Sequence, residues 1–128
     1  MTGRQGSSQA AIIGLRKRAD FLRLRRGFVQ RTRAVNIQAA SRLQNDRHIG
    51  IGFTATRKLG NAVTRNRVKR RLRAAAGALL PVHGRPGIDY VFIATPQTAR
   101  VSWQQLLDDV ETALISLAGR FGNDSEKT

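Results

Sequence analysis

One stretch, from residue 62 to residue 79, constrains the fold of this chain more than any other. Read at about 3.6 residues per turn, it predicts a helix of roughly five turns. Its apolar residues recur at i, i+4, i+7, i+8 and i+11, on one face of that helix: Val68, Leu72, Ala75, Ala76 and Leu79. We therefore expect this face to pack against the rest of the fold, with Gly60 turning the chain before the helix and Asn61 capping its first turn.

The rest of this helix surface carries charge of a single sign. No acid lies between Asp46 and Asp89, so the cations have no carboxylate partner one helical turn away. A charge run on a helix is usually a solvated face, and that is the simpler interpretation. Arginine, however, offers a planar fork to phosphate oxygens and stacks on bases, so this composition favours nucleic acid as a partner over solubility alone.

The total charge of the chain indicates the same partner. Its 128 residues, enough for one domain with a modest core, include 23 Lys and Arg against eight Asp and Glu, for a net charge of +15 and a pI near 12.0. Residues 21–73 hold fifteen cations and one acid, whereas residues 101–128 hold two cations and five acids. The first segment is therefore the predicted binding side, and the second a solvated scaffold.

Several classes of protein are disfavoured by what the chain contains. It has no cysteine, which excludes disulfides and thiolate metal sites, and no apolar run approaches the ~18 residues of a membrane span. Residues 10–15 are too short an apolar run for a signal peptide, so we expect a cytoplasmic protein with no membrane partner. His48 and His83 are its only histidines, and no nucleophile, general base or ligand set accompanies them. We predict no catalytic residue and no metal site in the chain itself.

Around the central helix the sequence predicts strands and further helices. Residues 1–13 indicate a disordered basic leader, residues 14–121 a single domain, and residues 122–128 a disordered tail. Within the domain we predict a first helix over 18–25 and a last helix entered through a capping box at Ser102 and Gln105. The predicted strands cover 28–32, 34–40, 49–56 and 88–95, and the last of them is apolar enough to be buried on both faces.

Two pairs of residues in these elements have more than one interpretation. Gly50 and Gly52 leave one face of their strand nearly bare, either for steric reasons or so that a ligand strand lies close to the backbone. Phe21 and Phe28 are either core residues or platforms on which an unpaired base stacks beside neighbouring arginines.

The run from Arg57 to Arg73 also resembles the signature of a known family, the bacterial ribonuclease P protein subunit. That signature reads basic-basic, apolar, Gly-Asn-Ala-Val, any residue, Arg-Asn-Arg, apolar, Lys-Arg, any residue, apolar, Arg. Every position of it is met here. The similarity extends more weakly, through the order and spacing of the elements, from about residue 15 to about residue 121.

This resemblance implies a fold and a function. The fold is α+β, a single-domain α/β sandwich with a four-stranded sheet and three helices in the order α-β-β-β-α-β-α, and its β-α-β crossover is left-handed against the usual rule. The function is that of an RNA-binding subunit of a ribonucleoprotein endoribonuclease, which assists a catalytic RNA in magnesium-dependent removal of the 5′ leader from precursor tRNA. The implied partners are the catalytic RNA, through which Mg²⁺ is held, and precursor tRNA. The protein alone would be inert and would need no obligate protein partner.

The resemblance also assigns candidate site residues. Those that would contact the catalytic RNA are Arg57, Lys58, Arg65, Asn66, Arg67, Lys69, Arg70 and Arg73. Those that would hold the single-stranded leader, in a cleft between the first helix and the sheet, are Lys17, Phe21, Phe28 and Gln38. Gln38 stands where many members of the family place an aromatic residue.

Two other classes of protein share part of this pattern. A ribosomal or ribosome-associated RNA-binding protein would have the same charge and a related fold, but would not be expected to carry the full Arg-Asn-Arg signature. A DNA-binding module needs a recognition helix preceded by a second helix, whereas here a predicted strand precedes the central helix.

Overall fold

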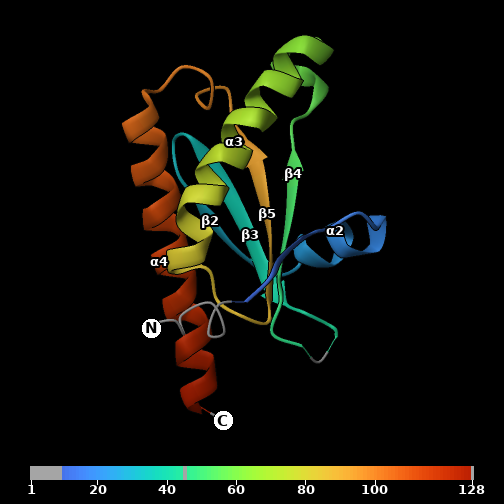
Figure 1. Cartoon of the computed structure of the whole chain (residues 1–128), viewed down its shortest axis with the longest axis vertical. Coiled ribbons are helices and arrows are strands. Elements are labelled where there is room, and N and C mark those ends of the chain that lie inside the picture. The colour runs from blue at the N-terminus through green and yellow to red at the C-terminus, as the bar shows by residue number, and fades with distance from the viewer. Residues whose placement is uncertain (1–9, 45, 128) are drawn as a thin grey trace.

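A five-stranded mixed sheet forms the centre of the molecule (Figure 1). The computed structural model describes residues 10–44 and 46–127, with side chains as far as residue 122. The strands are β1 (Ile12–Gly14), β2 (Phe28–Arg31), β3 (Val35–Ser41), β4 (Ile49–Thr54) and β5 (Ile88–Ala94). Their spatial order is β1-β4-β5-β3-β2, in which β1, β4 and β5 run parallel and β3 and β2 are antiparallel to their neighbours.

In the described part of the chain, three α-helices pack on this sheet. α3 (Ala62–His83) and α4 (Trp103–Lys127) cover one face, and the short α2 (Arg18–Leu24) lies on the other. A 3-10 turn, η1 (Arg57–Leu59), leads into α3. Apart from the extra strand β1, the predicted element order is confirmed, and the first helix and the four predicted strands agree with the structure to within two residues.

The crossover from β4 through α3 to β5 has the unusual hand that the resemblance implied. β4 and β5 are adjacent and parallel. In Figure 1 both strands point upward, β5 lies to the left of β4, and α3 crosses in front of them, which makes the connection left-handed.

The apolar core lies between the sheet and the helix pair α3–α4. The predicted stripe of α3 is buried from Val68 through Leu72 to Ala76, although Leu79 is only half-buried and Leu80 fills the core instead. β5 is buried along nearly its whole length, as its apolar run predicted, because β3 and β4 flank it and helices cover both faces of the sheet there.

The N-terminal segment differs from its prediction. The disordered leader was predicted to extend through residue 13, but Ile12 and Ile13 belong to β1. This short strand pairs in parallel with β4 and covers an edge that would otherwise present unpaired backbone groups. The first nine residues of the predicted leader lie outside the described residues.

α3 ends later than predicted. It continues through Pro81 to His83 instead of ending at residue 79. A proline inside a helix removes one N–H and crowds the carbonyl group four residues earlier. Here that earlier residue is the exposed Gly77, and Leu80, which is 1% exposed, holds the last turn against the core.

The predicted C-terminal tail belongs to α4 as far as residue 127, and residue 128 lies outside the described residues. This helix continues through Gly122 to Lys127. Neither Gly119 nor Gly122 adopts the positive φ with which a glycine commonly ends a helix, so the helical hydrogen bonding is not interrupted there.

The starts of both long helices follow the sequence more closely. Gly60 has φ 134°, and the side chain of Asn61 then accepts a hydrogen bond from the backbone N–H three residues later at 2.9 Å. Ser102 caps α4 by accepting from the backbone N–H of Gln105 at 3.0 Å. The predicted capping box is only half formed, because the Gln105 side chain donates to Asp109 at 2.7 Å.

Candidate nucleic-acid interface

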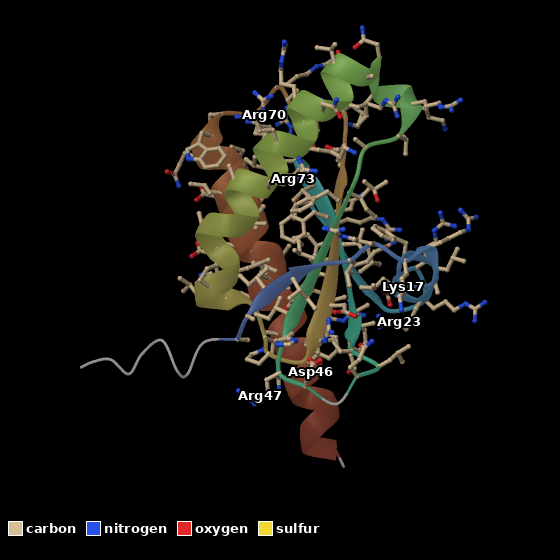
Figure 2. The ribbon with its side chains drawn as sticks, turned by 45° about the vertical axis from the view of Figure 1, so that its right-hand side comes forward. Lys17, Arg23, Asp46, Arg47, Arg70 and Arg73 are labelled. Carbon is tan, nitrogen blue, oxygen red and sulfur yellow. The ribbon has the colours of Figure 1, made fainter. Side chains whose placement is uncertain are left out.

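A cationic surface extends from η1 along the first half of α3. It contains all eight residues predicted to contact the catalytic RNA: Arg57, Lys58, Arg65, Asn66, Arg67, Lys69, Arg70 and Arg73. Arg65 and Lys69 are half-buried and the other six are exposed. Figure 2 shows Arg70 and Arg73 projecting from α3, well apart from Lys17 on the α2 side. The structure therefore brings this predicted group together.

The charges on this surface are not neutralised within the described part of the chain. None of its seven cations forms an ion pair with a described carboxylate; the ion pairs there involve Arg23, Arg42, His48 and His83. Arg73 packs over the ring of Phe53, 5.5 Å from its centroid, which orients the guanidinium without removing its charge. Such a surface repels itself and is stabilised when a polyanion binds.

One arginine of the same helix has a structural role that the sequence did not reveal. Arg71 donates to the carbonyl oxygens of Thr98 and Val101, the second at 2.6 Å. These bonds tie α3 to the loop between β5 and α4. The tie also brings Arg100 beside Lys58, where both line a cleft of about 260 Å³. Arg100 was missed because only the fold places it near η1.

The residues predicted to hold a leader strand are divided between the two faces of the sheet. Phe21 of α2 lies over Gly52, whose absent Cβ would stand 2.7 Å from the ring. Gly52, Val91 and Gln38 form one row across β4, β5 and β3, so Gln38 shares the face on which Phe21 lies. Lys17 is exposed at the N-terminal cap of α2.

Phe28 belongs to the opposite face. It pairs with Ala39, whose side chain is fully buried in the core beneath α3 and α4. Its ring makes an edge-to-face contact with Phe121 at 4.9 Å, and the guanidinium of Arg120 lies 4.3 Å from its centroid. The structure therefore joins Phe28 to α4 and separates it from Lys17, Phe21 and Gln38.

The two alternating glycines of β4 are explained by sterics. A Cβ at Gly50 would stand 2.0 Å from a carboxylate oxygen of Asp89, and one at Gly52 would meet Phe21. Both positions are buried. The alternative, a bare face against which a ligand strand lies, is wrong at these two residues because Asp89, Leu15 and Phe21 occupy that space.

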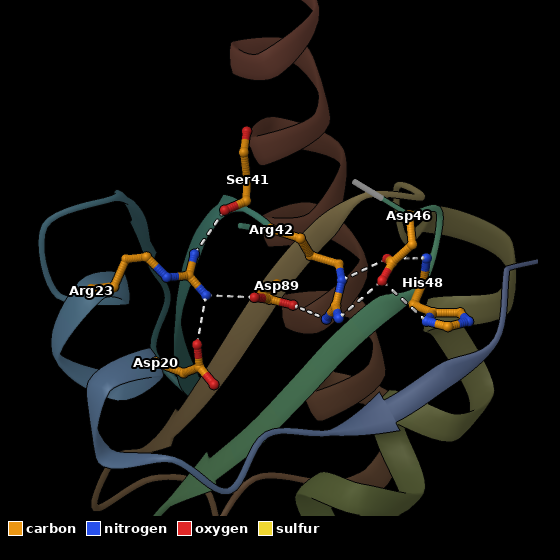
Figure 3. A network of polar contacts seen from close by, with 7 residues as sticks. All are labelled: Asp20, Arg23, Ser41, Arg42, Asp46, His48 and Asp89. Atoms are coloured by element: carbon orange, nitrogen blue, oxygen red, sulfur yellow. Dashed lines mark hydrogen bonds and ion pairs between the residues drawn. The ribbon is translucent and has the colours of Figure 1, made fainter. Parts of the chain in front are cut away.

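Beside α2, five charged residues form what we call the Asp89 cluster: Asp20, Arg23, Arg42, Asp46 and Asp89 (Figure 3). Asp89, only 1% exposed, accepts from Arg23 at 2.6 Å and from Arg42 at 2.7 Å. Arg23 also donates to Asp20 at 3.0 Å, and Arg42 to Asp46 at 2.8 Å. The local sequence did not predict this cluster, because Asp89, which joins the pairs Asp20–Arg23 and Arg42–Asp46, is 66 and 47 residues away from its two arginine partners.

The titration of these groups reflects their pairing. Burial alone would lower the pKa of Arg23 and of Arg42, but hydrogen bonds to their carboxylate partners raise both above the ordinary value. The backbone N–H of His48 donates to Asp46 at 3.0 Å and, together with Arg42, lowers the pKa of that carboxyl group. Each of these three shifts favours the charged form, so Arg23, Arg42 and Asp46 are ionised at neutral pH.

The described residues offer no constellation for hydrolysis. His83 pairs with Glu111 of α4 at 2.9 Å, and His48 lies 3.5 Å from Asp46, a carboxylate that Arg42 already engages. No three His, Cys, Asp or Glu side chains among the described residues are grouped so that they could hold a metal ion. No described helix is long and apolar enough to cross a membrane. What this part of the molecule does present is the cationic surface of η1 and α3, without a described carboxylate partner.

Comparison with known proteins identifies the family. The family model described as ribonuclease P matches residues 12–118. The chain belongs to the ribonuclease P protein family. Its relatives include the ribonuclease P protein component of Caulobacter vibrioides, 55% identical over 113 residues that cover 88% of this chain and 76% of that protein. The component of Ruegeria pomeroyi is 46% identical, covering 86% of this chain and 90% of that protein.

Solved structures of ribonuclease P proteins share the fold. A Staphylococcus aureus RNase P protein mutant with defective mRNA degradation activity superposes with a TM-score of 0.69 at 26% identity, covering 83% of this chain and 87% of that one. The RNase P protein from Thermotoga maritima gives a TM-score of 0.68 at 22% identity, covering 80% and 94%. Because the chain belongs to the ribonuclease P protein family, we do not retain the two other classes considered from the sequence, a ribosomal protein and a DNA-binding module.

Proposed function

We propose that this chain is the protein component of a bacterial ribonuclease P ribonucleoprotein. In that assembly it binds the catalytic RNA and the 5′ leader of precursor tRNA, and thereby assists endonucleolytic removal of the leader. The observation that carries the proposal is the cationic surface of η1 and α3, a complete Arg-Asn-Arg signature on a helix whose opposite face is buried in the core.

The cationic surface is the proposed contact with the catalytic RNA. Its exposed arginines present planar forks to phosphate oxygens, and the half-buried Arg65 and Lys69 sit at the edges of the helix near the sheet. Because α3 is fixed by core packing and by Arg71, the backbone that carries these groups is already in place before the RNA binds. No backbone conformational entropy of the helix then has to be lost on binding, which favours affinity.

The leader is proposed to bind between α2 and the sheet, near Lys17, Phe21 and Gln38. Lys17 is exposed and supplies charge, and Gln38 is half-buried and offers an amide that donates and accepts hydrogen bonds. One edge of the Phe21 ring packs against Gly52, and the side chain is partly buried. Only the part of the ring that remains exposed could stack on a base. Phe28 lies on the other face and is not part of this proposed contact.

The chain itself would position RNA without performing the cleavage step. The three carboxylates between residues 10 and 100, Asp20, Asp46 and Asp89, are engaged by Arg23 and Arg42, so they do not fit a Mg²⁺ site. We propose that Mg²⁺ is held through the RNA subunit, and that the protein works in the cytoplasm with that RNA and precursor tRNA as its partners.

Reconstitution tests this proposal. The purified chain is mixed with ribonuclease P RNA of Caulobacter vibrioides, the source of a relative that is 55% identical, at a magnesium concentration too low for efficient cleavage by the RNA alone. Addition of the chain should restore removal of the leader, whereas the chain without RNA should leave precursor tRNA intact. Failure to stimulate cleavage, or cleavage by the RNA-free protein, would contradict it.

A further inference from the structure

Helix α2 is anchored by few contacts. It has seven residues, a length at which an isolated helix is unstable in water, and its N-terminal cap Lys17 makes no side-chain capping bond. Leu24 is its only fully buried side chain, and the Phe21 ring rests on Gly52. These two apolar contacts leave the rotation of the helix on the sheet weakly specified, so its polar contacts decide its orientation.

Arg23 makes those polar contacts. In the last turn of α2, its guanidinium donates to Asp89 of β5 at 2.6 Å and to the carbonyl oxygen of Ser41 at the end of β3 at 2.7 Å (Figure 3). The same group donates to Asp20 one turn earlier on the helix at 3.0 Å. One planar side chain thus joins the helix to two neighbouring strands, and a planar fork fixes direction as well as distance.

Asp89 binds Arg23 and Arg42 at the same time because the surrounding residues keep its carboxylate buried and oriented. Its second oxygen accepts from Arg42 at 2.7 Å, and Arg42 in turn holds Asp46 in the loop before β4. Gly50 leaves room for the carboxylate, since a Cβ there would stand 2.0 Å from its oxygen. With 1% of its surface exposed, Asp89 is a fixed reference point within the sheet.

We propose that Asp89 and Arg23 are positioning residues for the 5′ leader of precursor tRNA. They set the orientation of α2 over the sheet, and so the spacing between Lys17 and Phe21 on the helix and Gln38 on β3. This inference rests on the proposed function, because the leader is taken to lie between α2 and the sheet. Neither residue need touch RNA, since both charges are already satisfied within the protein.

The test compares Arg23→Gln with Arg25→Gln in the reconstituted holoenzyme. Arg25 is exposed on the same short segment, so its variant removes the same charge without removing the bond to Asp89. KM and kcat are measured for precursor tRNA with a long leader and for the same tRNA with a one-nucleotide leader. Arg23→Gln should raise KM for the long-leader substrate about tenfold, leave kcat within about twofold, and affect the short-leader substrate little. Arg25→Gln should change both substrates alike.

Two further measurements separate positioning from general damage. Affinity for the catalytic RNA and the melting temperature are recorded for each variant, and Arg23→Gln should bind that RNA as the wild type does. Arg23→Lys, which keeps the charge and a single hydrogen bond, should recover part of the lost discrimination between the two leaders. Equal loss of discrimination in Arg23→Gln and Arg25→Gln, or none in either, would overturn the positioning role alone. A wild-type holoenzyme that does not distinguish the two leaders would overturn the leader contact of the proposed function and the positioning role with it.

Discussion

The two faces of the sheet are stabilised by different means. On one face, α3 and α4 bury a continuous apolar core that includes Leu72, Phe92 and Leu114. On the other, α2 is held by the ring of Phe21, by Leu24 and by the buried Asp89 cluster. The helices on the first face form a scaffold, and the solvent-exposed side of α3 can therefore carry unpaired arginines. The second face uses its acids to neutralise Arg23 and Arg42, so those two cations support the structure and are not available to RNA.

This difference shows how so basic a chain can be stable. A net charge of +15 opposes folding through self-repulsion. The acids between residues 10 and 100, Asp20, Asp46 and Asp89, all lie in the Asp89 cluster, where they help to fix a helix that apolar burial alone holds weakly. Exposed cations also surround α2, but their densest run lies on α3, whose core packing is extensive enough to tolerate the repulsion. Substitutions on the two faces should therefore have different consequences.

The largest effect should come from Asp89→Asn. Removing this buried charge leaves Arg23 and Arg42 without their shared partner, and breaking such a pair typically costs about 3–5 kcal/mol of unfolding free energy. Chemical denaturation measures the loss. Asp108→Asn is the matched control, because Asp108 is exposed on α4. If Asp89→Asn and Asp108→Asn lower the free energy of unfolding by the same small amount, the Asp89 cluster does not stabilise the packing of α2 on the second face.

The next effect should come from Leu72→Ala on the first face. Leu72 of α3 is fully buried against the core, so truncation leaves a cavity. We expect a loss of about 2–5 kcal/mol in the free energy of unfolding. Leu43→Ala makes the same chemical change at a side chain that is 75% exposed, and it should cost less than about 0.5 kcal/mol. The midpoints of chemical denaturation measure the two losses. Similar midpoints for the two variants would show that α3 does not turn Leu72 toward the core.

Arg67→Ala should separate binding from stability. Arg67 is exposed on α3, so its loss should leave the melting temperature unchanged or slightly raised. Affinity for the catalytic RNA should fall by about 1–3 kcal/mol, the scale of a charge-assisted hydrogen bond. Arg47, exposed in the loop before β4 and far from Arg70 and Arg73 in Figure 2, gives the control Arg47→Ala with equal loss of charge. Equal losses of affinity would mean that only total charge matters.

The smallest effect should come from the two phenylalanines that lie on opposite faces. Phe28→Leu removes an aromatic contact with Phe121 and should cost about 0.5–1.5 kcal/mol of stability while leaving leader discrimination intact. Phe21→Leu should reduce that discrimination. The measurement is discrimination between the two substrates, given by the ratio of KM for short-leader to KM for long-leader precursor tRNA. If Phe28→Leu reduced this ratio, the leader would lie on the face of the sheet opposite to the one we propose.

Local pattern was sufficient to predict the first face. The 3.6-residue period of α3, the apolar run of β5 and the caps Asn61 and Ser102 each depend on neighbours along the chain, and each prediction is confirmed. The helix ends were harder to predict. α3 was predicted to end at residue 79 and a disordered tail to begin at residue 122, yet packing of Leu80 carries α3 through Pro81, and α4 continues past Gly122.

The second face could not be predicted in this way. Arg23 and Asp89 are 66 positions apart, and nothing in either local sequence indicates that they meet. Gly50 and Gly52 did signal an unusual face, but whether a ligand or the protein itself fills the space depends on where α2 lies. The same reason explains why Phe28 was grouped with Phe21 before strand register placed it elsewhere.

The salt dependence of binding tests the central claim most directly, namely that α3 binds the catalytic RNA through unneutralised arginines. If roughly four to six phosphates are contacted, a plot of log affinity against log salt concentration should have a slope of about −3 to −5. Arg67→Ala should make that slope less steep by about 1, while Arg47→Ala leaves it unchanged. A wild-type slope near zero, or the same slope in the wild type and Arg67→Ala, would contradict the account.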